Sequence, residues 1–162
     1  MAAYKEEVRE KIIAALHADL ALLTQAARSA HAGATHAECL PDNKYDTTAL
    51  EASYVAQGQA NRAQDIRRAL ESYRTLALRP FNDETPIRLT ALVTIAAEDG
   101  SCRQLFLGPD AGGLRLTEPG AEFMVITPES TLGRALLGRK CGDELQIGSG
   151  AARKTFTIIA VA

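Results

Sequence analysis

The chain has 162 residues, of which 46% are apolar and 23% are charged, a balance that favours a folded chain with a modest hydrophobic core over a disordered one. The 18 Lys and Arg are offset by 20 Asp and Glu. Because neither half of the sequence is basic, we expect no autonomous DNA binding through phosphate contacts.

The N-terminal sequence MAAYKEEVREK is too acidic for the first region of a signal peptide. The apolar run that follows is interrupted by His17 and Asp19, so we expect no membrane span. Cys39, Cys102 and Cys141 are odd in number and form no C-x-x-C pair. Reduced thiols in a cytoplasmic protein fit this spacing better than a disulfide framework.

Up to about residue 78 the apolar residues recur every three or four positions, which predicts two long amphipathic helices. The first stripe contains Ile12, Leu16, Leu20, Leu23, Ala27, Ala30, Ala34 and Ala37, and the second contains Ala52, Ala56, Ala60, Ala63, Ile66, Leu70, Tyr73 and Ala77. When the chain is folded between them, large residues oppose large ones and small residues oppose small ones. The pattern therefore predicts an antiparallel helical hairpin over residues 1–78, packed as a coiled coil.

The segment between the two stripes concentrates negative charge. Residues 37–47, AECLPDNKYDT, contain Glu38, Asp42 and Asp46, and Pro41 marks a point that the first helix cannot pass. These carboxylates repel one another unless a cation relieves the repulsion, so an acidic tip near 38–46 is a candidate metal-assisting site. The simpler interpretation is a solvated polar turn in which Asp46 caps the second helix.

From Pro80 the pattern changes from helix to strand. Residues 79–86 contain two prolines and predict a linker, and residues 87–162 predict a small, mostly antiparallel sheet with one short helix behind Ser130. The expected strands lie in IRLTALVTIAA, CRQLFL, FMVIT, DELQI and TFTIIAVA, and the expected helix lies in TLGRALLG. The fold class is therefore α+β.

Two stretches resemble the bacterial Gre-type transcription elongation factors, the GreA/GreB transcript-cleavage family. Residues 125–147, VITPESTLGRALLGRKCGDELQI, are similar to the signature of the C-terminal domain of that family, which has an FKBP-like fold. Residues 42–66, DNKYDTTALEASYVAQGQANRAQDI, are similar to the segment that follows the acidic tip of its helical hairpin. The resemblance spans nearly the whole chain and implies a hairpin followed by an FKBP-like domain that docks on bacterial RNA polymerase.

The resemblance implies that the hairpin enters the secondary channel of the polymerase. There the tip carboxylates would support Mg²⁺ in the polymerase active site, where the metal activates water to cleave backtracked RNA. Asp42 is the expected main ligand, with Glu38 or Asp46 as helper. In this interpretation the chain is an accessory factor and not an enzyme by itself. We expect it to hold no metal stably and to act as a monomer.

Further contacts follow from the same resemblance. Asn43 and Tyr45 would shape the tip or touch the RNA 3′ end, and Arg62, Arg67 and Arg68 of the second helix would contact the extruded RNA. Ion pairs with Asp65 and Glu71 are a simpler role for these arginines. Docking on the polymerase would use Pro128, Glu129, Ser130 and Arg134.

A binding regulator without cleavage activity is the main alternative. Cleaving members of the family carry an acidic residue three positions before the acidic–Asn pair, whereas Cys39 precedes Asp42–Asn43 here. Such a regulator would occupy the same channel and compete with cleavage factors. Prolyl isomerase activity is not expected, because the four Phe are spread over four predicted elements instead of forming an aromatic pocket.

Overall fold

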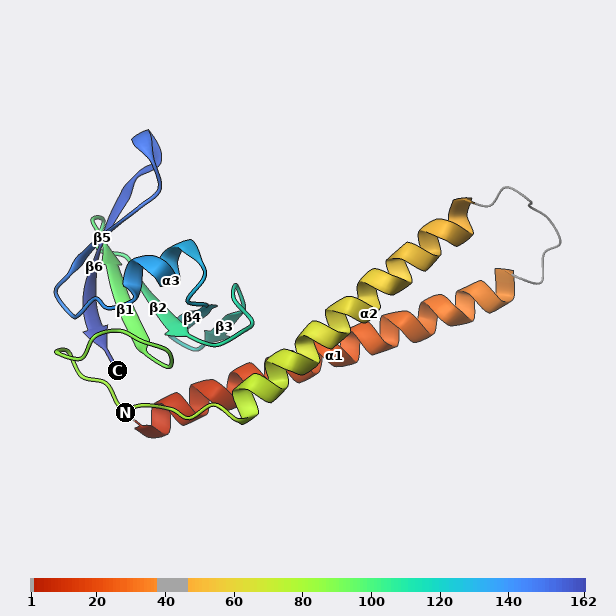
Figure 1. Ribbon diagram of the computed structural model, residues 1–162, viewed down its shortest axis with the longest axis horizontal. Helices are drawn as coiled ribbons and strands as arrows, with labels where there is room; N and C mark the ends of the chain where they lie inside the picture. Colours follow the sequence, from red (N-terminus) through yellow and green to blue (C-terminus); the bar gives the residue numbers. More distant parts are fainter. Residues whose placement is uncertain (1, 38–46) are drawn as a thin grey trace. The chain divides into compact units, whose positions relative to one another are not determined.

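The computed structural model describes residues 2–37 and 47–162 (Figure 1). It begins with two long helices, α1 (Ala2–Ala37) and α2 (Thr47–Arg74). The remaining elements are β1 (Leu92–Ala97), β2 (Cys102–Leu107), β3 (Arg115–Glu118), β4 (Ala121–Ile126), α3 (Thr131–Leu136), β5 (Glu144–Ile147), the 3-10 turn η1 (Gly150–Ala152) and β6 (Lys154–Val161). The α+β class, two helices followed by a mostly antiparallel sheet with one short helix, is confirmed.

The described chain divides into two compact units. The hairpin unit contains residues 14–71, and the sheet unit contains the first turns of α1, up to Ile13, with everything from Ser72 onward. The limits expected from the sequence, 1–78, 79–86 and 87–162, differ from this division. The difference arises because hydrogen bonds tie the first turns of α1 to the rest of the sheet unit, such as that from the Tyr4 hydroxyl to Gln104 at 3.5 Å.

The six strands form one sheet in the order β3-β4-β2-β1-β6-β5. Only the β2–β4 pair is parallel, and the other four pairs are antiparallel. Strand β3 was not predicted from the sequence. It has four residues, RLTE, at the edge of the sheet, where a short charged strand lacks the apolar run by which buried strands are recognised.

One face of the sheet carries the main core of this unit. Its buried residues are Ile87, Ala91, Val93, Ile95, Leu105, Leu107, Ile126, Leu136, Leu145, Phe156, Ile158 and Val161. Leu136 comes from α3, so this helix covers that face (Figure 1). Because side chains alternate along a strand, Phe106 of β2 lies on the opposite face, where its ring centroid is 6.5 Å from that of Tyr73 in the last turn of α2.

The predicted linker is bonded into the sheet unit. Asn82 and Thr85 close a turn through their side chains and backbone. The Asp83 carbonyl accepts a hydrogen bond from Cys141 N, and the Arg79 N–H donates to the Thr90 hydroxyl at 3.0 Å. Residues 79–86 are thus hydrogen-bonded to other parts of the sheet unit, at Thr90 and Cys141.

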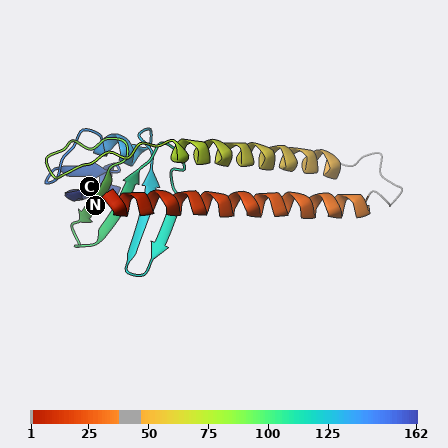
Figure 2. The same ribbon diagram turned by 90° about the horizontal axis from the view of Figure 1, so that it is seen from below.

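In the hairpin unit α1 and α2 run side by side in opposite directions in both views (Figure 1, Figure 2). Among the side chains of this unit whose burial is described, Leu16, Ile66, Ala69 and Leu70 are buried, and all four lie close in sequence to its limits at residues 14 and 71. Farther along the helices the described side chains are mostly exposed. Side-chain burial is therefore concentrated at one end of this unit.

Candidate functional site

The acidic tip predicted from the sequence falls between the two helices. Glu38, Asp42, Asn43, Tyr45 and Asp46 follow the last residue of α1, Ala37, and precede the first residue of α2, Thr47. These five residues lie outside the described residues, so their role as metal-assisting or RNA-contacting groups stays a prediction.

The three arginines singled out on α2 are all exposed. Arg68 approaches Asp65 at 3.9 Å, and their side chains are 70% and 62% exposed. A pair this exposed contributes little to stability. Arg67 lines the groove between the helices, whereas Arg62 does not.

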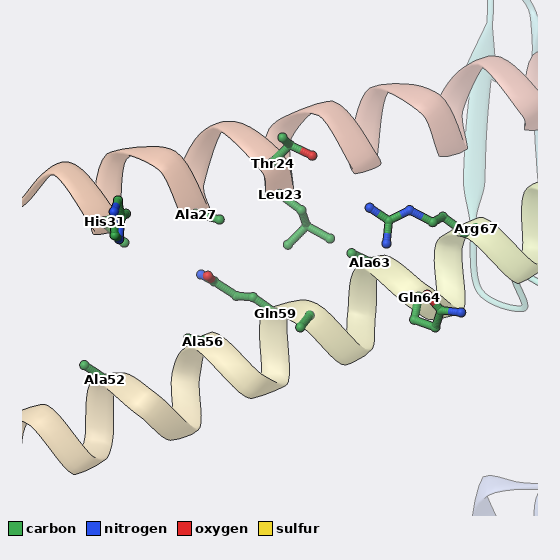
Figure 3. A pocket seen from close by; sticks show the side chains of 12 residues that line it. Leu23, Thr24, Ala27, His31, Ala52, Ala56, Gln59, Ala63, Gln64 and Arg67 are labelled. Carbon is green, nitrogen blue, oxygen red and sulfur yellow. The ribbon is translucent and has the colours of Figure 1, made fainter. Parts of the chain in front are cut away.

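An open groove of about 670 Å³ lies between α1 and α2 (Figure 3). Leu23 of α1 and Gln59 and Arg67 of α2 project into the space between the two ribbons (Figure 3). Its lining residues are Leu23, Thr24, Ala27, Ala30, His31, Ala52, Ala56, Gln59, Ala60, Ala63, Gln64 and Arg67. The two predicted stripes therefore do face each other.

The small residues of the stripes do not close the groove. Ala27 and Ala30 of α1 and Ala52 and Ala56 of α2 line it and remain exposed. An alanine methyl reaches only a short way from its helix, so two facing alanine stripes pack closely only if the helix axes approach. The alanines of this described part of the hairpin unit therefore line an open groove.

The loop before α3 is shaped by Ser130 and Gly133. Ser130 is the N-cap of α3: its hydroxyl oxygen accepts from Gly133 N at 3.0 Å, and its hydroxyl donates to Thr127 O at 2.7 Å. A Cβ on Gly133 would fall far inside van der Waals contact of the Thr127 carbonyl. The T-P-E-S-x-x-G sequence therefore folds into a tight capped turn in which both the serine and the glycine are required.

The predicted docking residues border this turn. Glu129 and Arg134 are exposed, and Pro128 and Ser130 are half-buried. Of the leucines of this helix, Leu136 is fully buried, whereas Leu137, the residue that follows α3, is 40% exposed. The exposed charges next to the capped turn are available for contact, and their docking role stays a prediction.

A buried lysine was missed by the sequence analysis. Lys5 is 3% exposed, and its Nζ donates to Arg79 O at 2.5 Å and Ala162 O at 3.1 Å, 4.4 Å from the Phe81 ring centroid. Burial lowers the pKa of Lys5 to about 8. Its spacing from Val8 and Ile12, which places it on the apolar face of α1, was the signal that could have found it.

No group of three or more His, Cys, Asp or Glu that could hold a metal ion occurs within residues 2–37 and 47–162. In the same ranges, neither α1 nor α2 is apolar enough over a sufficient length to cross a membrane.

The chain is similar over most of its length to solved structures of transcription factors. A structure of the transcription factor Gfh1 is 22% identical, with 92% of each chain covered and a TM-score of 0.41. Thermus aquaticus Gfh1 is 20% identical, with 90% of each chain covered and a TM-score of 0.38. The elongation factor GreA/GreB from Nitrosomonas europaea is 18% identical, with 70% of this chain and 93% of that chain covered and a TM-score of 0.34.

No protein-family model matches the chain, and no curated protein matches it. At TM-scores below 0.5 and identities below 25%, the structural similarities identify neither a family nor an activity.

Proposed function

We propose that this chain is a transcription elongation factor that binds bacterial RNA polymerase, with its sheet unit as the docking part and its hairpin in the secondary channel. The observation that carries the proposal is the segment 125–147. Its sequence resembles the signature of the Gre C-terminal domain, and it forms a continuous unit of β4, capped turn, α3 and β5. The serine and glycine of the signature have defined structural roles in that turn.

The hairpin supports the second part of the proposal. Two long helices flank a connecting segment that contains Glu38, Asp42 and Asp46. Carboxylate oxygens are the ligands that Mg²⁺ prefers, and a Mg²⁺ held by the polymerase supplies the activation of water for RNA cleavage. In this role Asp42 is the main ligand, and Glu38 or Asp46 assists. The chain itself is an accessory factor, acts in the cytoplasm as a monomer and holds no metal of its own.

A second candidate function is regulation without cleavage. Cys39 occupies the position three residues before Asp42, where cleaving members of the resembled family carry a carboxylate. One fewer carboxylate lowers the negative charge available to a second, weakly held cation. A chain of this kind would occupy the channel and exclude cleavage factors.

The decisive experiment is RNA cleavage by a stalled, backtracked bacterial polymerase in Mg²⁺, with and without this protein. We expect stimulation by the natural sequence, its loss in Asp42→Asn and its retention in Asp65→Asn, which removes the same charge from an exposed helical position. Binding to the polymerase without stimulation would select the regulator. Absence of polymerase binding would contradict both functions.

Docking is tested separately by measuring affinity for the polymerase. Arg134 is exposed beside the capped turn, and Arg88 is an exposed arginine elsewhere in the sheet unit. Arg134→Gln should weaken binding about tenfold if its guanidinium donates a charge-assisted hydrogen bond to the partner, whereas Arg88→Gln should leave the affinity unchanged. Equal effects of the two substitutions would remove Arg134 from the docking surface.

A further inference from the structure

Two neighbouring cavities of the sheet unit share one arginine. The first, of about 300 Å³, lies along β2, β4 and β3, and is lined in part by Arg103, Leu105, Arg115 and Met124. The second, of about 240 Å³, is lined in part by Arg103, Arg153, Lys154 and Phe156. Because Arg103 lines both, the two cavities form one surface, which we call the basic sheet surface. None of the basic residues of this surface was singled out by the sequence analysis.

Arg103 is held at the centre of this surface. Arg103 and Leu105 are two residues apart on β2, so their side chains lie on the same face of the sheet. Phe156 of β6 belongs to the core on that face. The guanidinium carbon is 5.8 Å from the centroid of the Phe156 ring. A cation–π contact of this kind restrains the side chain while leaving its N–H donors available.

The cations of this surface are poorly matched by carboxylates. Within residues 2–37 and 47–162, Arg103, Arg153 and Lys154 form no ion pair. The Arg153 guanidinium donates to the neutral Gln146 side chain at 3.3 Å. Three positive side chains therefore border the shared cavities without a bound counter-charge.

The acidic groups at the same cavities are Glu98, Asp99 and Glu122. Asp99 accepts from the Ser101 backbone N–H at 2.9 Å and from the Ser101 hydroxyl at 2.6 Å. These hydrogen bonds lower the pKa of Asp99, and the nearby charge of Lys154 adds to the effect. Glu122 approaches Arg115 at 3.9 Å, with both side chains largely exposed. The two cavities are thus lined by four basic and three acidic side chains, and Arg115 is the one basic residue among them that forms an ion pair within the described chain.

We infer that the basic sheet surface docks an acidic segment of a partner protein. Carboxylates of that segment would accept hydrogen bonds from Arg103 and from Arg153 or Lys154, because charge-assisted pairs of this geometry are the strong ones. An apolar side chain of the segment would lie against Met124, which is only partly buried. The inference concerns the chemistry of the segment and does not depend on the polymerase as partner.

A protein segment fits this surface better than a nucleic acid does. Phosphates recur at a fixed spacing along a strand, and Glu98 and Glu122 would repel a continuous row of them. A protein segment can instead place carboxylates opposite the arginines and apolar or basic groups opposite the glutamates.

The test uses the full chain and three fluorescein-labelled probes: a twelve-residue peptide of repeated Asp-Leu-Gln, whose carboxylates are spaced apart, the same peptide with Lys in place of Asp, and a twelve-nucleotide single-stranded RNA. Fluorescence anisotropy gives the affinities. Amide chemical shifts of the ¹⁵N-labelled protein, which at 17.3 kDa suits this method, locate the contact. We expect only the acidic peptide to bind and to shift amides in β2, β4 and the start of β6.

Matched variants identify the cations. Arg103→Gln, and Arg153→Gln combined with Lys154→Gln, should each weaken binding of the acidic peptide about tenfold, as expected for loss of a charge-assisted hydrogen bond. Arg139→Gln with Lys140→Gln removes the same charge from another exposed part of the sheet unit and should change affinity less than twofold. Far-UV circular dichroism confirms that each variant is folded.

Three results would overturn the inference. The first is no binding of the acidic peptide by the natural sequence. The second is an equal loss of binding in the Arg139 and Lys140 control, which would indicate nonspecific attraction. The third is tighter binding of the RNA that depends on Arg103, which would assign the surface to nucleic acid.

Discussion

The contact between Tyr73 and Gly108 can be tested by a double-mutant cycle. Tyr73 is fully buried at the end of α2, and its hydroxyl donates to Asp110 O at 2.8 Å. A Cβ added at Gly108 would clash with that hydroxyl and would lie 3.0 Å from Tyr73 Cζ and 3.3 Å from Val125 Cγ1. The hydroxyl thus occupies the space in which any other residue at position 108 would place its side chain.

The magnitudes follow from these contacts. Tyr73→Phe removes one hydrogen bond and should lower the free energy of unfolding by about 1 kcal/mol. Gly108→Ala overpacks the site, and because the hydrogen bond fixes the hydroxyl, we expect a loss of about 3 kcal/mol. In the Tyr73→Phe background the atom responsible for the clash is gone, so Gly108→Ala should cost only about 1 kcal/mol. The two substitutions should therefore couple by about 2 kcal/mol.

The assay is urea unfolding followed by circular dichroism at 222 nm and by the near-ultraviolet signal of the tyrosines, with coincident transitions required. Gly58 of α2 provides the control, because a Cβ there meets nothing within 4 Å. Gly58→Ala should be additive with Tyr73→Phe. Additivity of Gly108→Ala and Tyr73→Phe to within about 0.5 kcal/mol would refute the packing of the Tyr73 hydroxyl against Gly108.

Three further outcomes test the sheet and hairpin units. In chemical denaturation, Gly133→Ala should lower the free energy of unfolding by about 2 kcal/mol or more, because its methyl group would clash with the Thr127 carbonyl. Gly58→Ala lies in an open helical position and should raise the free energy of unfolding by about 0.5–1 kcal/mol. The unfolded chain keeps the ordinary lysine pKa of 10.5, while Lys5 in the folded chain has a pKa of about 8, so the unfolded state binds more protons between these values. Between pH 8 and pH 10.5 the free energy of unfolding should therefore rise with pH, by at most about 1.4 kcal/mol per pH unit more than in Lys5→Met. The same pH dependence of unfolding in both proteins would contradict this. Hydrogen exchange should be slower for amides 66–70 than for amides 50–56, because only the former carry buried side chains, and uniform protection along α2 would contradict the burial gradient.

The elements with a strong period could be predicted from the sequence. The helical stripes predicted α1 and α2, and the strands β1, β2, β4, β5 and β6 lie in the predicted apolar runs. The end of α2 differs from the prediction: the apolar pattern continues to Ala77, but the helix ends at Arg74. Tyr73, at the end of the stripe, contacts Phe106, and a contact between such distant parts of the chain is not contained in any local period.

Tertiary contacts explain what sequence analysis missed. Lys5 interrupts an apolar stripe and reads as a solvated charge, yet the carbonyls of Arg79 and Ala162 satisfy it in the folded chain. Arg103 has an unremarkable place in β2, and only the folded sheet brings it over Phe156. The groove between the helices was also not predicted, since the stripes indicate which faces meet and not how closely the axes approach.

Most residues proposed to bind partners are separate from those that hold the fold, and Ser130 belongs to both groups. Ser130 and Gly133 close the turn before α3, so substitutions there should lower stability as well as any binding. Arg103 and Lys154 form no ion pair in the described chain and stabilise little. Asp42 lies outside the described residues. Charge-neutral substitutions at these positions should therefore leave the fold intact, so a loss of binding or cleavage in them reports on function and not on unfolding.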